Sequence, residues 1–356
     1  MIRSTGSGQA AAEKFRAEAA KRILITDGGF GTEIQRWKLG ETDYAGQLGL
    51  ARDQKGNNDI LVLTKPEVPE SIHRAYFEAG SDIASTNTFS ANRISQSDYG
   101  AEHLVREINV ASAKLARSVA DEFTAKDGRP RFVAGSLGPT NKTLSLSPDV
   151  NDPGYREVDF DQLKAVYREQ IEALVEGGID FILVETIFDT LNAKAAIMAT
   201  LEAEQELGRE LPLLLSMTLT DLSGRNLSGH TVEAFWATVR HSKPLTVGLN
   251  CSFGAAQLRP HLAALSRIAD TLIMAYPNAG MPNELGEYDE AAAETAAQIA
   301  EWIDEGLINV VGGCCGTAPA HIAAIAEAAN GKPPRKIAAP QHHTLLAGLE
   351  PMVIAA

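Results

Sequence analysis

Short apolar runs alternate with amphipathic segments along most of the chain. Each run is continuously apolar, which predicts strands covered on both faces, as in a parallel sheet. Eight such runs occur, at residues 23–26, 82–85, 132–134, 181–184, 213–217, 245–249, 271–275 and 307–311. The segments between them place apolar residues at helical spacing; Ile108, Ala111, Leu115 and Val119, for example, share one helix face.

Eight strands, each followed by a helix, predict a (β/α)8 barrel, the TIM-barrel fold, as a single domain. A doubly wound open sheet is the alternative arrangement of the same elements. We divide the chain into an N-terminal tail and helix over residues 1–20, the barrel over 21–335, and an irregular C-terminal tail over 336–356. Within the first part, residues 1–10 are expected to be disordered and the helix to begin at residue 11.

Two long connections interrupt the regular alternation. Residues 33–65 and 141–160 show little periodicity, and long connections of this kind are often functional. Both follow predicted strands. They should therefore lie on the rim at the carboxyl ends of the strands, where a barrel of this type carries its active site.

The composition narrows the functional classes. Lys and Arg number 32 against 46 Asp and Glu, a net charge of −14. This balance argues against a nucleic-acid partner, because phosphate binding needs a basic face. No apolar run is long enough to span a membrane, and the N-terminus lacks a signal-peptide core, so we expect a cytoplasmic protein. Three cysteines, an odd number, do not fit a disulfide scaffold.

All three cysteines follow predicted strands. Cys251 comes after the run 245–249. Cys314 and Cys315 come after the run 307–311, just before a helix for which Thr317 is the expected N-cap. A disulfide between adjacent cysteines would be strained. Because barrel strands end on one rim, we expect the three thiols to meet there and to bind Zn²⁺ with a fourth position open; three small buried residues are the alternative interpretation.

Three thiolates give a zinc site a net charge of −1. Such a site activates water poorly, but it can hold a substrate thiol as a thiolate at neutral pH, which predicts alkyl transfer to sulfur. Asp27 and Glu185 also follow strands and should reach the same rim. Together they could pair with a substrate ammonium group, whereas a helix cap or a salt bridge at the barrel mouth is the structural alternative.

Eight motifs carry a resemblance to a known family. They are residues 27–32 (DGGFGT), 55–59 (KGNND), 86–89 (TNTF), 138–141 (GPTN), 147–154 (SPDVNDPG), 184–190 (VETIFDT), 248–251 (GLNC) and 312–316 (GGCCG). Together they resemble the homocysteine-binding module of cobalamin-dependent methionine synthase, over nearly all of residues 20–335. The cysteine pattern is similar to that of the wider group of zinc-dependent homocysteine methyltransferases, which are (β/α)8 barrels.

The resemblance implies a role for individual residues. The implied zinc ligands, and hence catalytic residues, are Cys251, Cys314 and Cys315. The implied substrate-binding residues are Asp27, Gly28, Gly29, Phe30, Glu185 and Asn250. Of these, the two carboxylates would bind the amino group of homocysteine, and backbone N–H groups of residues 28–30 would receive its carboxylate. The homocysteine sulfur would take the fourth position on zinc.

The methyl donor is left open by the sequence. Enzymes of the cobalamin-dependent branch continue into folate-binding, cobalamin-binding and reactivation modules, and these do not fit in the residues after 335. We therefore expect methylcobalamin, methylated ultimately from methyltetrahydrofolate, to be supplied by a separate cobalamin- and folate-binding methionine synthase subunit. The alternatives are a self-sufficient enzyme that uses betaine or S-methylmethionine, and a zinc- or thiol-binding module without catalysis.

Overall fold

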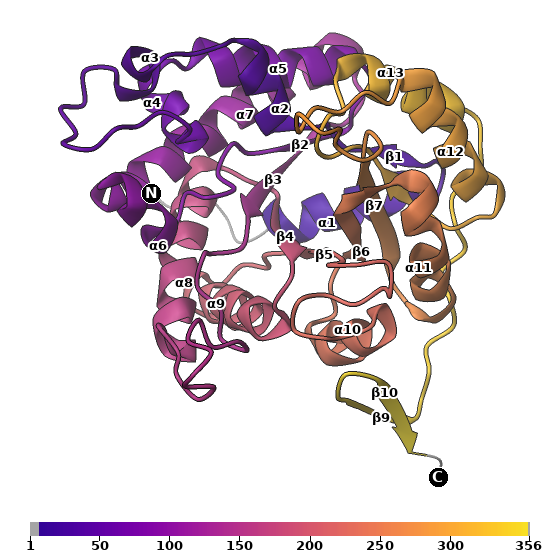
Figure 1. The fold of residues 1–356 in the computed structure, drawn as a ribbon. Coiled ribbons are helices and arrows are strands. Elements are labelled where there is room, and N and C mark those ends of the chain that lie inside the picture. The colour runs from indigo at the N-terminus through magenta and orange to yellow at the C-terminus, as the bar shows by residue number, and fades with distance from the viewer. Residues whose placement is uncertain (1–6, 355–356) are drawn as a thin grey trace.

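The computed structural model describes residues 7–354, which form a ring of eight parallel strands with helices around it (Figure 1). The strands are β1 (Leu24–Ile25), β2 (Ile83–Ser85), β3 (Phe132–Leu137), β4 (Phe181–Ile187), β5 (Leu213–Met217), β6 (Thr246–Gly254), β7 (Leu272–Asn278) and β8 (Val310–Val311). They pair in the order β1-β8-β7-β6-β5-β4-β3-β2, and a parallel bridge between Thr26 and Ile83 closes the ring. The predicted TIM barrel is confirmed, and the open sheet is excluded.

The helices outside the ring follow the predicted order. The main ones are α5 (Glu67–Glu78), α7 (Val105–Asp127), α8 (Phe160–Gly177), α9 (Thr190–Leu207), α10 (Val232–Val239), α11 (Ala255–Ile268), α12 (Ala292–Asp304) and α13 (Pro319–Ala329). In α8 the ends follow from local chemistry. Asp159 and Gln162 exchange side-chain and backbone hydrogen bonds as a capping box, and Gly178 ends the helix at a φ of 99°.

An N-terminal helix covers the end of the barrel at which the strands begin. Helix α1 (Ser7–Ala19) begins earlier than predicted, and residues 7–10 are helical; residues 1–6 of the segment expected to be disordered lie outside the described residues. Its Phe15 is fully buried and packs edge-on against Phe132 and Phe181, with ring centroids 5.4 and 5.1 Å away. Phe132 and Phe181 are the first residues of β3 and β4, so α1 covers the end opposite the predicted active site.

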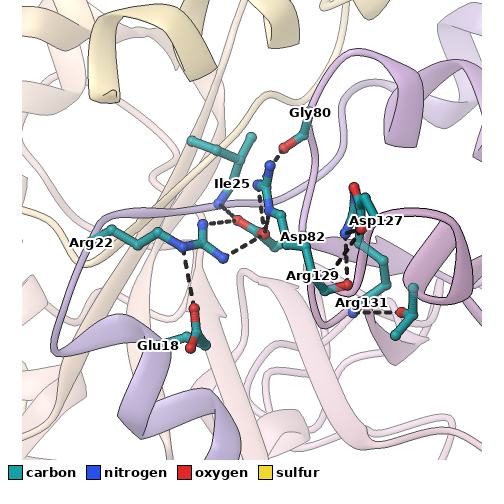
Figure 2. Close-up of polar contacts among 9 residues, drawn as sticks. Glu18, Arg22, Ile25, Gly80, Asp82, Asp127, Arg129 and Arg131 are labelled. Carbon is teal, nitrogen blue, oxygen red and sulfur yellow. Dashed lines mark hydrogen bonds and ion pairs between the residues drawn. The ribbon is translucent and has the colours of Figure 1, made fainter. Parts of the chain in front are cut away.

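Polar side chains just before three strands hold the adjacent strands at this end. Asp82, whose side chain is fully buried, accepts a hydrogen bond from the Ile25 N–H at 2.8 Å and pairs with Arg22 and Arg129 (Figure 2). Asp82 therefore stabilises the short contact between β1 and β2. The same arrangement recurs: Asp180 accepts from the Val133 N–H at 2.8 Å, and Asn309 accepts from the Ile273 N–H at 2.9 Å.

The first long connection is more ordered than the sequence indicated. It contains α2 (Phe30–Arg36), α3 (Glu41–Ala45), the 3₁₀ turn η1 (Asn58–Ile60) and α4 (Leu61–Thr64), all too short to show a helical period. Asn57 and Gln96 are both buried and exchange two amide hydrogen bonds of 2.9 and 3.0 Å, which fasten this connection to α6 (Arg93–Gln96). The second connection, residues 138–159, contains neither helix nor strand, as predicted.

The C-terminal tail is not irregular, which corrects the prediction. Strands β9 (Thr344–Ala347) and β10 (Pro351–Ile354) form an antiparallel hairpin beside α10. Arg225 pairs with Glu350, and the Thr231 N–H donates to the Leu349 carbonyl at 3.2 Å, so the hairpin tip is tied to the loop before α10. Four-residue strands with mostly exposed side chains leave no alternation to detect. No helix within residues 7–354 has the length and apolar character required to cross a membrane.

Candidate metal centre and substrate cavity

A cavity of about 650 Å³ opens at the carboxyl ends of the strands. Its wall includes the turn after β1, the loops after β2 and β3, the end of β4 and all three cysteines. This is the rim on which a (β/α)8 barrel carries its catalytic residues. Asp27 and Glu185 line the same cavity, so the structure brings the predicted metal ligands and the predicted ammonium-binding acids together.

Cys251 is directed into the cavity by an irregularity in β6. The pairing of β6 with β7 shifts register between Asn250 and Gly254. Cys251 and Ser252 adopt left-handed φ angles of 60° and 61°, which are unfavourable for residues other than glycine by about 1–3 kcal/mol each. Strained backbone at a bulge is typical of functional sites, because it redirects a side chain that regular strand geometry would place elsewhere.

The glycine pair before Cys314 permits a close approach of two loops. A Cβ on Gly312 would lie 2.4 Å from the Thr26 side chain, and one on Gly313 would lie 2.2 Å from the Thr317 hydroxyl. The Cys314 N–H donates to the Pro277 carbonyl at 2.7 Å, which fixes the turn against β7. Thr317 is not the helix N-cap: α13 begins at Pro319, and the Thr317 hydroxyl instead donates to the Cys314 carbonyl at 2.6 Å.

The three sulfur atoms are spaced as tetrahedral zinc requires. Ligand atoms bound at about 2.3 Å to a tetrahedral ion lie about 3.8 Å from one another. The Cys251 and Cys315 sulfurs are 3.8 Å apart, the Cys314 and Cys315 sulfurs are 4.0 Å apart, and all three lie within 4.8 Å of one another. The donor set therefore fits zinc, with three ligands from the protein and a fourth position facing the cavity.

The thiols oppose one another's ionisation in the absence of a cation. The pKa of Cys314 is raised well above that of a free thiol, because it donates hydrogen bonds to the neighbouring sulfurs and is buried. Cys315 accepts from both neighbours, and its pKa is lowered to about 3. The cluster thus holds one negative charge easily, and further charge requires a metal ion, which favours thiolate over thiol at each ligand.

Asp27 is held by the turn that follows β2. Its carboxylate accepts from the Ser85 N–H at 2.7 Å and from the Ser85 hydroxyl at 3.1 Å. Burial and, less strongly, the charge of Glu185 raise the pKa of Asp27 to about 7 against the lowering effect of those hydrogen bonds. Two carboxylates that disfavour each other's charge form a natural site for an ammonium group.

Glu185 lies within β4 and is held by two residues that the sequence analysis missed. The Ser136 hydroxyl donates to one of its oxygens, and the Tyr276 hydroxyl donates to the other at 3.1 Å. Burial raises the pKa of Glu185, while these two hydrogen bonds lower it. Burial also raises the pKa of Tyr276, which keeps that hydroxyl a donor. Ser136 and Tyr276 lie near the carboxyl ends of β3 and β7, on the same rim, which is the one signal that could have identified them.

The cavity wall is acidic and carries no balancing cation. Four carboxyl side chains and the three thiols line it, and no Lys, Arg or His side chain does so among residues 7–354. The carboxyl groups belong to Asp27, Asp59, Asp98 and Glu185. Asp59 is 4% exposed, and burial raises its pKa to about 7. A positively charged group on the substrate would supply the missing counter-charge.

Two substrate-binding predictions need correction. Asn250 is fully buried and does not line the cavity; its side chain bonds to the Thr186 backbone and hydroxyl at 3.1 and 2.8 Å and so supports β4 from behind. The Gly29 N–H already donates to Thr317. Gly28 and Phe30 line the cavity, and within residues 7–354 their N–H groups have no protein acceptor, so only these two can receive a substrate carboxylate.

Taken together, fold and site define a TIM barrel that presents three thiols and two carboxylic acids in one cavity. The chain matches the family described as Homocysteine S-methyltransferase over residues 24–329, and it belongs to that family. The family assignment makes the protein a methyltransferase, with homocysteine as the substrate of the family.

Solved structures with the same fold agree with the family assignment. The metallated form of the homocysteine methyltransferase MmuM from Escherichia coli matches with a TM-score of 0.67 and 22% identity, over 88% of this chain and 98% of that one. Its oxidized form matches with a TM-score of 0.66 and 23% identity, over 86% of this chain and 95% of that one. At this level of identity the similarity establishes a shared fold.

Proposed function

We propose that the protein is a zinc-dependent homocysteine S-methyltransferase that forms methionine. The observation that carries this proposal is the spacing of the Cys251, Cys314 and Cys315 sulfurs, which suits a tetrahedral ion, in a cavity that two carboxylates also line. Zinc held by three thiolates would supply one thing, the stabilisation of the substrate sulfur as a thiolate at neutral pH. The remaining tasks fall to the residues of this chain.

The cavity residues bind and orient the amino acid part of homocysteine. Asp27 and Glu185 pair with its ammonium group, and the free N–H groups of Gly28 and Phe30 receive its carboxylate. These contacts leave the side chain to extend toward the cysteines. The thiol proton leaves to solvent on binding, a sulfur lone pair then attacks the methyl carbon, and the bond between that carbon and the donor breaks with its electron pair going to the donor.

We further propose methylcobalamin on a separate cobalamin- and folate-binding subunit as the donor. The acidic wall disfavours methyltetrahydrofolate, whose glutamate carboxylates would meet four carboxyl groups and no cation. Corrin side chains end in neutral amides, and four asparagines line the cavity: Asn57, Asn58, Asn87 and Asn141. Residues 148–155 of the rim connection are exposed, with Val150 94% accessible, and they offer a surface to a large partner.

One observation favours a second candidate. The acidic wall equally suits a cationic donor that acts without a partner, such as S-methylmethionine or betaine. The two proposals separate in a single assay of methionine formation from homocysteine with methylcobalamin, S-methylmethionine, betaine or methyltetrahydrofolate, with and without a cobalamin-binding subunit from the same cell. We expect turnover with methylcobalamin and none with methyltetrahydrofolate alone; turnover with S-methylmethionine or betaine only would establish the second candidate.

A separate binding measurement tests the zinc chemistry. Homocysteine binding should release about one proton at pH 7, because the metal selects the thiolate of a thiol with a pKa of about 8.5. Calorimetry in buffers of different ionisation enthalpy measures this release. Homocysteine binding by zinc-loaded protein without methionine formation from any donor would show a binding module instead of an enzyme.

A further inference from the structure

Tyr276 lies on β7, between β6, which carries Cys251, and β8, which leads into the turn with the other two cysteines. Strand β7 pairs on one side with β6, where Tyr276 is in register with Asn250, the residue before Cys251. On its other side the Gly312 N–H donates to the Ala275 carbonyl at 3.2 Å, next to the turn that carries Cys314. The backbone of Tyr276 is thus flanked by both halves of the metal centre.

The side chain of Tyr276 points into the barrel and connects this centre to the ammonium site. It is 5% exposed and belongs to the interior cluster of apolar side chains, against which Cys314 packs. Its hydroxyl donates to Glu185 at 3.1 Å. One rigid side chain therefore contacts the carboxylate proposed to take the substrate nitrogen and belongs to the apolar cluster against which one of the thiols packs.

The distance between Glu185 and the thiols decides whether homocysteine or cysteine fits the site better. Both amino acids carry the same ammonium, carboxylate and thiol groups, and they differ by one methylene between the α-carbon and sulfur. Discrimination by one methylene in an enzyme site is about 10–200-fold, and it requires walls that do not adjust. The cysteines and the two acids can discriminate between the two amino acids only if the distance between the cysteines and the acids is fixed.

We propose that Tyr276 is the specificity-determining residue that fixes the spacing between Glu185 and the thiols, so that the site selects homocysteine over cysteine. This proposal rests on the function proposed above. The hydroxyl holds the carboxylate in place for either amino acid, whereas the ring sets the distance and hence the preferred chain length. The two parts of the side chain can therefore be separated by mutation.

Calorimetric affinities of zinc-loaded protein for L-homocysteine and L-cysteine test the proposal. Tyr276→Phe keeps the ring and removes the donor, so both affinities should fall by about tenfold and their ratio should stay. Tyr276→Leu removes the spacer, so the ratio of homocysteine to cysteine affinity should fall by about tenfold or more. Tyr167→Phe is the matched control, since Tyr167 is equally buried and donates to the Gly138 carbonyl outside the cavity; it should change neither value.

The outcomes separate the two proposals. A Tyr276→Leu protein that binds zinc and keeps the wild-type ratio overturns the role of Tyr276 as a spacer. If that variant loses zinc, Tyr276→Met, with a side chain closer in length, decides by the same ratio. Wild-type protein that binds zinc and fails to bind either thiol amino acid contradicts the proposed function itself.

Discussion

Replacing Glu185 by glutamine removes charge at the ammonium site with little change in shape. In the wild-type protein the Glu185 carboxylate accepts from Ser136 and Tyr276, and both donors are neutral. Glutamine can accept from one of them, and the other hydroxyl can turn to accept from the new amide. The cysteines take no part in these hydrogen bonds, so zinc binding should be retained.

The expected loss of homocysteine affinity follows from the loss of one ion pair, between Glu185 and the substrate ammonium group. A hydrogen bond that involves a charged group contributes about 1.5–3 kcal/mol, which corresponds to roughly a 10- to 150-fold weaker affinity for homocysteine. The pH dependence gives a second signature. Because burial raises the pKa of Glu185, the wild-type carboxyl gains its proton at a higher pH than an ordinary glutamic acid. Wild-type affinity should therefore fall on acidification before that of Glu185→Gln does.

Calorimetry with homocysteine and metal analysis on the same preparations measure both quantities. Glu107→Gln, on an exposed part of α7, is the matched control and should bind like wild type. If Glu185→Gln loses zinc in proportion to homocysteine affinity, the carboxylate supports the fold of the rim and does not bind the substrate nitrogen.

Three further substitutions test other parts of the account. Cys251→Ser should reduce zinc from one ion per chain to nearly none by metal analysis, and full occupancy would contradict the three-cysteine site. Asp82→Asn should lower the free energy of unfolding by about 2–4 kcal/mol in urea titrations, because it removes the buried negative charge that pairs with both Arg22 and Arg129, with zinc content unchanged. The pKa of Asp59 is raised from 3.8 to about 7, so its contribution to stability is lost as pH rises through that window. Asp59→Asn should therefore gain about 4 kcal/mol relative to wild type between pH 4 and pH 8, and a constant difference would refute the shift.

The features that repeat along the chain could be predicted from sequence. Continuous apolar runs reveal buried parallel strands, and strand ends meet on one rim, so Cys251 and Cys314 could be placed together although 63 positions separate them. The short helices of residues 30–64 and the C-terminal hairpin could not, because each is too short for a repeating pattern of apolar and polar residues to stand out.

The direction in which a side chain points was also beyond the sequence. Asn250 and Cys251 are neighbours, yet at the bulge in β6 the Asn250 side chain bonds to β4, whereas Cys251 lines the cavity. Tyr276 and Ser136 have no motif of their own, and only the packed barrel shows that both hold Glu185. Local strain and contacts between distant strands decide these positions, and neither has a signature in hydrophobic pattern.

The central claim is that the three cysteines hold zinc and that the homocysteine sulfur completes its coordination. Zinc K-edge X-ray absorption of the purified protein tests it directly, since sulfur at about 2.3 Å is distinguished from oxygen or nitrogen at about 2.0–2.2 Å. The account predicts three sulfur ligands and one lighter ligand without homocysteine, and four sulfur ligands with it. A first shell that keeps three sulfurs at saturating homocysteine would contradict it.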